Sequence, residues 1–167
     1  ALDHGAKHLI VGIGGSSTND GGAGMAQALG VKLLDKDGQA IGFGGAALAS
    51  LHSIDCSEVD SRLKNVKLEV ACDVDNPLCG EKGASAIFGP QKGATPEIVK
   101  ALDANLAHYA DLMKSELGSD VKNSAGAGAA GGMGAALMGI FHADLRPGIE
   151  IVMDAVNLSK QLKDADL

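Results

Sequence analysis

Short apolar runs along this chain alternate with long polar or glycine-rich stretches. Residues 8–13 (HLIVGI) are mostly apolar and β-branched, which predicts a buried strand. Residues 66–72 alternate between apolar and polar positions and predict a second strand. Residues 149–153 (IEIVM) predict another strand, which ends at Asp154. The hydrophobic pattern thus predicts strands in three separate parts of the chain.

The clearest predicted helix begins with Thr95 as its N-cap and Pro96 at its first position. Apolar side chains then recur every three or four residues until Gly118, which ends the helix. Small residues predict two further helices, one over residues 25–30 and one that follows a glycine-rich loop within residues 124–141. We expect the long helix to be structural scaffold.

Residues 31–41 alternate on both sides of an Asp37-Gly38 turn and predict a hairpin. The segment from Asp73 to Pro96 is irregular in pattern, and a long loop of this kind inside a domain is usually functional. Alternating strands and helices predict the α/β class, and the hairpin favours a mixed sheet over a purely parallel one.

The length of 167 residues suits one domain, so we expect residues 1–167 to form a single domain. The chain opens on Ala1 in a pattern typical of the last turn of a helix. Residues 158–167 are typical of a short helix followed by the first apolar residue of another element. Both ends therefore indicate a piece of a longer protein.

Charge and composition exclude several classes of function. The 14 Lys+Arg and 21 Asp+Glu residues give a net charge of −7, which argues against binding to nucleic acid or to an anionic membrane. No apolar run reaches the ~18 residues of a membrane span, and no signal peptide is evident. The three cysteines lack C-x-x-C spacing and the five histidines lack metal-ligand spacing. We therefore expect a reduced, cytoplasmic protein.

A loop rich in glycine and hydroxyl side chains follows the first predicted strand. Glycines let backbone N–H groups turn toward an anion, a helix N-terminus favours negative charge, and hydroxyls add donors. Residues 14–22, called the glycine–serine loop below, therefore predict a cradle for phosphate or carboxylate. Its candidate ligands are Gly14, Gly15, Ser16, Ser17, Thr18, Asn19 and Asp20. The alternative is a capping turn, in which Asn19 or Asp20 satisfies the first N–H groups of the next helix.

A second glycine pattern, Gly-x-Gly-x-x-Gly, is formed by Gly126, Gly128 and Gly131. It is a candidate second ligand-binding loop, although no predicted strand immediately precedes it. The alternative is close packing of a helix through small residues. Neither glycine pattern is a Walker A loop, because the chain contains no Gly-Lys-Ser/Thr.

Two carboxylates, Asp73 and Asp75, come directly after the strand predicted at residues 66–72. Ligands of open α/β sheets bind outside this edge, where such carboxylates hold a cation or act as a general base. The alternative is an Asx turn ahead of Asn76-Pro77. Lys92 lies in the same segment between glycines and is a candidate for neutralising phosphate charge, with a solvated surface lysine as the alternative.

Four stretches of this chain resemble, in order and spacing, the signature stretches of bacterial glycerate kinases. They are VGIGGSSTNDGGAGMAQALG, ACDVDNPLCGEKGASAIFGPQKGATP, GAGAAGGMGAAL and LRPGIEIVMDAV. The resemblance implies a two-domain α/β fold with the active site between the domains, of which this chain is chiefly the second domain. It also implies transfer of the γ-phosphoryl group of ATP to D-glycerate with Mg²⁺, with 2-phosphoglycerate as the favoured product.

With this resemblance, we expect the glycine–serine loop to receive an anionic group. Asp73 and Asp75 would hold Mg²⁺ or accept the proton of the substrate hydroxyl, and Lys92 would stabilise the transferring charge. Two stretches expected of the family, similar to PDSFKGSLSA and TGEGRIDGQT, do not occur here. The chain by itself is therefore expected to be inactive. A homo-oligomer is left open.

Two other readings compete with this one. A different small-molecule kinase is suggested by GIGGSS, which is similar to the glycine–serine loop of the homoserine and mevalonate kinase superfamily. In that superfamily a helix follows the serines directly, whereas Thr18-Asn19-Asp20 intervene here. A non-catalytic metabolite-binding or assembly domain, whose glycine loops only pack helices or hold a metabolite, is the other alternative.

Overall fold

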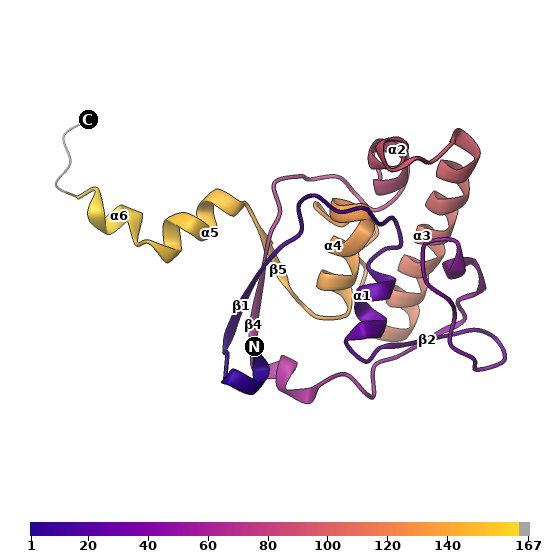
Figure 1. The fold of residues 1–167 in the computed structure, drawn as a ribbon, viewed down its shortest axis with the longest axis horizontal. Coiled ribbons are helices and arrows are strands. Elements are labelled where there is room, and N and C mark those ends of the chain that lie inside the picture. Colours follow the sequence, from indigo (N-terminus) through magenta and orange to yellow (C-terminus); the bar gives the residue numbers. More distant parts are fainter. Residues whose placement is uncertain (164–167) are drawn as a thin grey trace.

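The computed structural model describes residues 1–163. It contains two small sheets and a set of helices (Figure 1). The strands are β1 (His8–Gly12), β2 (Lys32–Leu34), β3 (Ser53–Asp55), β4 (Lys67–Ala71) and β5 (Asp144–Arg146). The α-helices are α1 (Ala23–Ala28), α2 (Ala84–Phe88), α3 (Pro96–Leu117), α4 (Ala129–Gly139), α5 (Gly148–Ala155) and α6 (Leu158–Gln161). Short 3₁₀ helices are η1 (Leu2–His4), η2 (Ala47–Ser50), η3 (Ser61–Asn65) and η4 (Pro90–Lys92).

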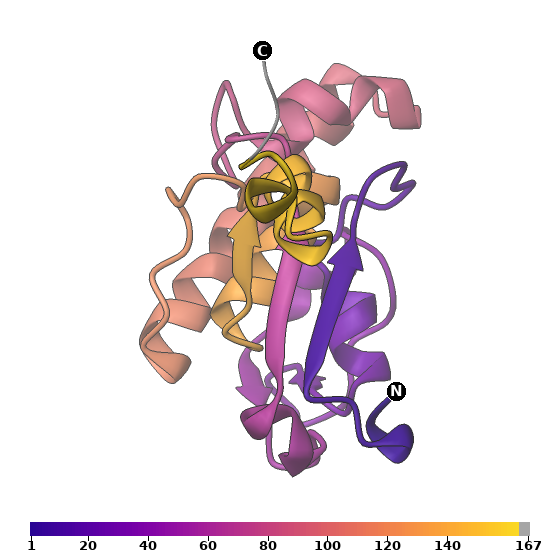
Figure 2. The same cartoon turned by 90° about the vertical axis from the view of Figure 1, so that its left-hand side faces the viewer.

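Three parallel strands, in the order β1-β4-β5, form the sheet that positions the site (Figure 2). The strand predicted at residues 8–13 is present as β1, but its predicted burial is wrong, because β1 lies at the edge of the sheet and Ile10 is 51% exposed. Strands β2 and β3 pair antiparallel in a separate sheet. The α/β class with both parallel and antiparallel pairing is therefore confirmed. The predicted hairpin is present as well, because Ile41 N donates to Leu33 O at 2.9 Å across the Asp37-Gly38 turn.

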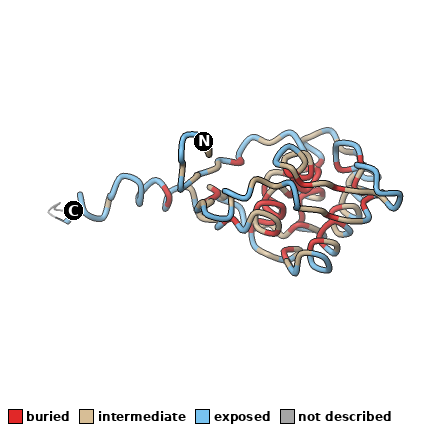
Figure 3. Tube along the Cα trace, turned by 90° about the horizontal axis from the view of Figure 1, so that it is seen from below, coloured by how far each residue is buried: buried red, intermediate tan, exposed pale blue. Residues whose placement is uncertain are grey.

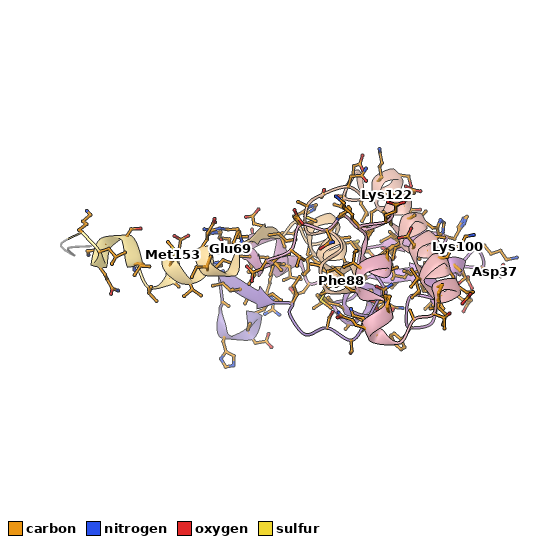
Figure 4. All side chains as sticks on the ribbon, turned by 90° about the horizontal axis from the view of Figure 1, so that it is seen from above. Asp37, Glu69, Phe88, Lys100, Lys122 and Met153 are labelled. Carbon is orange, nitrogen blue, oxygen red and sulfur yellow. The ribbon has the colours of Figure 1, made fainter. Side chains whose placement is uncertain are left out.

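The two faces of the parallel sheet differ because successive side chains of a strand point to opposite sides. On one face Val70, which is 0% exposed, packs with Ala129 and Leu137 of α4. The opposite face carries Glu69 and Arg146, which form an ion pair with an N–O distance of 2.9 Å. Arg146 also pairs with Asp154 of α5 at 2.7 Å. Ion pairs of Arg146 thus connect this second face to α5. Figure 4 labels Glu69 at this place.

The helix predicted from Thr95 to Gly118 is confirmed as α3. Thr95 Oγ1 accepts a hydrogen bond from Ile98 N, and Gly118 ends the helix in the left-handed conformation. Tyr109 and Met113 belong to its apolar stripe, are 0% exposed and pack in the main core. The predicted scaffold role of this helix agrees with that burial.

The strand predicted at residues 149–153 is wrong, because these residues lie in helix α5. Pro147 stands at the N-cap, and Gly148 N donates to Asp73 Oδ1 at 2.8 Å. A contact from a distant part of the chain thus satisfies the first turn of the helix, which the local β-branched pattern does not reveal. The strand that completes the sheet is β5, a few residues earlier.

The segment from Asp73 to Pro96 is less irregular than its pattern predicts. It contains α2 and η4, which bring Phe88 and Lys92 to the parallel sheet's carboxyl edge. Both elements are short, and glycines at positions 83, 89 and 93 flank them. The predicted small-residue helices are confirmed as α1 and α4.

Helices α5 and α6 extend away from the rest of the molecule (Figures 1 and 3). Their apolar side chains are largely exposed, with Ile149 at 66% and Val152 at 56%. The predicted short helix near the end of the chain is confirmed as α6, whereas residues 164–167 lie outside the described residues. None of the helices among residues 1–163 combines the length and the apolar composition needed to cross a bilayer.

Candidate active site

A cleft of about 410 Å³ lies at the carboxyl ends of β1 and β4. Both strands run in the same direction, so the loops that follow them meet at one edge of the sheet. The lining residues from these loops include Gly14, Gly15, Ser16, Cys72, Asp73 and Val74. The segment after α2 adds Gln91 and Lys92. Three parts of the chain with predicted chemistry therefore border one cleft.

Lys92 joins two of these parts directly. Its Nζ donates to Ser16 Oγ at 2.9 Å and to the main-chain oxygen of Thr18 at 2.6 Å. Partial burial lowers the pKa of Lys92 from its ordinary value, and the nearby Asp20 acts in the opposite direction. The lysine is thus a half-buried cation held against the glycine–serine loop, in contrast to the solvated surface lysine of the alternative reading.

The remaining residues of the glycine–serine loop have different surroundings. Gly14 and Gly15 line the cleft, whereas Ser17 and Thr18 are exposed. Asp20 is 6% exposed, and its two carboxylate oxygens accept hydrogen bonds from Gly22 N at 2.9 Å and Gly24 N at 3.0 Å. The capping alternative therefore describes Asp20, whose carboxylate satisfies the N–H groups at the start of α1.

Asn19 connects the loop to α2. Its Nδ2 donates to Ser85 Oγ at 2.8 Å, and Ser85 is 0% exposed. Asn19 Oδ1 is buried as well, and within residues 1–163 no hydrogen-bond donor reaches it. The side chain of Asn19 thus faces α2 and the interior.

Asp73 and Asp75 both follow β4 and are exposed. Asp73 lines the cleft, and its Oδ1 accepts a hydrogen bond from Gly148 N. Asp75 instead lines an adjoining cleft of about 540 Å³, which it shares with Asp73 and Arg146. Asp73 therefore stands at the wall between two compartments, and Asp75 belongs to the second.

Gly126, Gly128 and Gly131 are buried and lie against other main-chain segments. A Cβ atom on Gly128 would be 2.3 Å from the oxygen of Pro77, and one on Gly131 would be 1.9 Å from the oxygen of Thr18. The surroundings of these glycines match the packing alternative. From this segment the cleft is lined by Ala129 and Ala130.

Comparison with known proteins agrees with this arrangement. The family model described as "Glycerate kinase family" matches residues 1–167. The chain belongs to the glycerate kinase family. It is 60% identical to "Glycerate kinase" of Bacillus subtilis (strain 168) and 58% identical to "Glycerate 2-kinase" of Escherichia coli (strain K12), over 167 residues in each case. Each alignment covers 100% of this chain and 44% of the relative.

A solved structure agrees equally well. The structure described as "Crystal structure of putative glycerate kinase 2 from Salmonella typhimurium LT2" superposes with a TM-score of 0.96 at 59% identity. The match covers 99% of this chain and 44% of that one. The chain therefore spans less than half the length of the glycerate kinases that it matches.

Membership of a kinase family implies a bound magnesium ion, and the side chains of the site can be tested for whether they could hold one. Within residues 1–163, no group of three or more His, Cys, Asp or Glu side chains is placed to hold a metal ion. Mg²⁺ at kinase sites usually takes one or two carboxylates and completes its shell with water and substrate phosphate. The exposed carboxylates of Asp73, which borders both clefts, and of Asp75, in the adjoining cleft, fit an ion held by few protein ligands.

Sequence reasoning missed Phe88 and Ala130 as lining residues of the cleft. Phe88 ends α2, a five-residue helix too short to give a periodic signal. Ala130 adopts φ = 55°, a left-handed conformation that is uncommon for a residue with a Cβ atom. The one available signal for Phe88 was its position within the family stretch SAIFGPQKG.

Proposed function

We propose that this chain supplies the second domain of a glycerate kinase that transfers the γ-phosphoryl group of ATP to D-glycerate with Mg²⁺. The observation that carries the proposal is that Lys92, held by Ser16 and by the main-chain oxygen of Thr18, lines the same cleft as Asp73. Family membership over the whole chain supports glycerate as the acceptor. The other small-molecule kinase and the non-catalytic domain are disfavoured by the same match.

Phosphoryl transfer needs positioning and charge stabilisation more than covalent chemistry from the protein. In the proposed mechanism the ammonium group of Lys92 stabilises negative charge on the transferring phosphoryl oxygens. The backbone of Gly14 and Gly15 and the hydroxyl of Ser16 line the same cleft as Lys92 and are the proposed further donors to this anion. Bound Mg²⁺ would neutralise phosphate charge, with the exposed carboxylate of Asp75 as its proposed protein ligand, so that Asp73 stays available as a base.

Asp73 is the proposed general base. Its carboxylate accepts the proton of the glycerate hydroxyl as that oxygen bonds to the γ-phosphorus, while the bond from phosphorus to the β-phosphate oxygen breaks and ADP leaves. The hydrogen bond from Gly148 N holds one carboxylate oxygen and orients the group. The relative named "Glycerate 2-kinase" supports the 2-hydroxyl as the acceptor, with 2-phosphoglycerate as the product.

The proposal also covers the setting of the reaction. ATP is a cytoplasmic substrate, and the free thiols of Cys56, Cys72 and Cys79 fit a reducing compartment. We therefore propose that the kinase works in the cytoplasm. Because the chain spans 44% of its relatives, we expect turnover from the complete protein and none from residues 1–167 alone.

The direct test incubates the complete protein with ATP, MgCl₂ and D-glycerate. ADP release is followed by a coupled assay, and ³¹P NMR distinguishes 2-phosphoglycerate from 3-phosphoglycerate. We expect glycerate-dependent ADP release that stops when EDTA is added and 2-phosphoglycerate as the product. ADP release that does not depend on D-glycerate would contradict the acceptor, and a 3-phosphoglycerate product would contradict the assigned hydroxyl.

A further inference from the structure

Ser85 is a fully buried polar residue in α2 for which the mechanism above gives no role. Its Oγ accepts the 2.8 Å hydrogen bond from Asn19 Nδ2, which joins α2 to a loop 66 residues earlier in the chain. Burial of a hydroxyl group lowers the stability of the fold unless the group makes a hydrogen bond, so the bond to Asn19 offsets the cost of burying Ser85.

The loop side of the bond is fixed by the backbone. A Cβ atom on Gly45 would be 2.2 Å from the oxygen of Asn19, and one on Gly131 would be 1.9 Å from the oxygen of Thr18. Two main-chain segments thus pack closely against the loop at consecutive residues. The amide of Asn19 therefore offers Ser85 a donor at a set position.

The α2 side of the bond leads to the cleft by short main-chain steps. Gly89 N donates to Ser85 O at 3.0 Å, and Lys92 N donates to Gly89 O at 2.9 Å. A Cβ atom on Gly89 would be 2.3 Å from Ser85 O, so these turns are closely packed. Lys92 Nζ then returns to the oxygen of Thr18. The contacts form a closed ring: Asn19, Ser85, Gly89, Lys92 and Thr18.

We propose that Asn19 and Ser85 form a positioning pair that sets where the ammonium group of Lys92 lies relative to the glycine–serine loop. The inference rests on the proposed function, in which Lys92 stabilises the transferring phosphoryl group. Ser85 is buried and acts through Lys92, so it is a positioning residue and not a catalytic one. A directional hydrogen bond at one end of the 85–92 segment fixes the other end, where an apolar contact would allow sliding.

A double-mutant cycle in the complete protein tests the pair. Ser85→Ala and Lys92→Met are made singly and together, and kcat, KM and thermal stability are measured for each. We expect Ser85→Ala to lower kcat about tenfold with a smaller change in the KM for D-glycerate, since displacement of a positioned group by ~1 Å costs up to 10²-fold. In the Lys92→Met background, Ser85→Ala should change kcat less than about twofold. Independent, multiplying effects on kcat would overturn the proposal.

Two further variants keep the test interpretable. Ser50→Ala removes a hydroxyl that donates only to Ala47 O and should leave kcat unchanged. If Ser85→Ala does not fold, Ser85→Cys leaves no cavity, adds a slightly larger atom and weakens the hydrogen bond, so the same cycle is run with it. A kcat for Ser85→Cys equal to that of the unaltered protein contradicts the pair.

A readout independent of turnover separates this inference from the proposed function. NMR titration of ¹³Cε-labelled lysine in the complete protein follows Lys92, with the Lys92→Met protein used to identify its signal. If the pair holds Lys92 in its half-buried place, Ser85→Ala should raise the pKa of Lys92 toward the ordinary lysine value. An unchanged titration contradicts the pair. Absence of turnover in the unaltered protein contradicts only the proposed kinase activity.

Discussion

Gly131 lies against the main-chain oxygen of Thr18 so closely that a Cβ atom on Gly131 would be 1.9 Å from it. Gly21 N also donates to Gly131 O at 3.0 Å. The two glycine-rich stretches, more than a hundred residues apart, therefore pack backbone to backbone. The stretch that contains Gly131 therefore supports the glycine–serine loop from behind, and the glycine–serine loop itself borders the cleft.

We predict that Gly131→Ala destabilises the protein far more than Gly118→Ala. The two glycines have nearly the same φ, 69° and 71°, but a Cβ atom on Gly118 would contact nothing within 4 Å. Gly118→Ala should cost about 1–2 kcal/mol for the left-handed backbone alone. Gly131→Ala adds about 1–3 kcal/mol of overpacking and should cost about 2–5 kcal/mol in total. Urea denaturation of the complete protein measures both, and equal losses would show that the Thr18 contact is unimportant.

Lys92 should define the alkaline limb of the pH profile. Because burial lowers its pKa, the lysine loses its charge at a lower pH than an ordinary lysine, so kcat should fall as pH rises through that lowered value. Lys92→Arg keeps its charge and should remove this limb, although with a lower kcat because the guanidinium has a different shape. Measurement of kcat between about pH 7 and 11 tests this, with the exposed Lys100→Met as the control. An unchanged alkaline limb in Lys92→Arg argues against the role of the lysine.

Asp73→Asn should reduce kcat by about 10² or more, because an amide does not accept the proton of the hydroxyl. The amide oxygen still accepts the hydrogen bond from Gly148 N, so the thermal stability should change little. Asp37→Asn, in the exposed hairpin turn, is the matched control and should leave kcat unaltered. A loss below tenfold in a normally folded Asp73→Asn protein rejects the general-base role.

Glu69 should make stability depend on pH under acidic conditions. Hydrogen bonds from Lys67, Arg146 and His8 lower the pKa of Glu69 from 4.5 to about 2. The ionised group therefore contributes its full stabilisation above about pH 4.5, and this is lost as pH falls toward 2. Glu69→Gln should lower Tm at pH 7, with a difference that shrinks below pH 4.5. A difference that stays constant with pH, or that the exposed Glu81→Gln also shows, would contradict the assignment.

Local signals predicted the elements that carry their own boundaries. Helix α3 has Thr95, Pro96 and Gly118 at its ends, and β1 lies in an apolar run between polar and glycine-rich residues. Strand β5 has three residues and is defined by pairing with β4, so no pattern within it was available. Helix α5 was mistaken for a strand because Ile149, Ile151 and Val152 favour a strand locally, while Asp73, far away in the chain, accepts a hydrogen bond from the first N–H of the helix.

One rule predicted part of the site: ligands of open α/β sheets bind beyond the carboxyl ends of the strands. That rule places the residues after β1 and β4 together, and the cleft between Ser16 and Asp73 follows from it. The position of Lys92 between glycines in the loop segment made it a candidate, but its contact with Thr18 depends on α2, which gave no signal of its own. The sequence also left Asp20 open between ligand and cap, and only the three-dimensional placement of Gly22 and Gly24 assigns it to the cap.

The fully buried Tyr109 is the sole tyrosine of a chain without tryptophan, and a Cβ atom on Gly21 would lie 2.8 Å from its ring. When residues 1–167 are excited near 280 nm, the emission therefore comes from Tyr109, which lies directly beneath the glycine–serine loop. Ultraviolet emission gives a built-in, label-free probe of that interior position, and absorbance at the same wavelength will understate how much of the span is present in a sample.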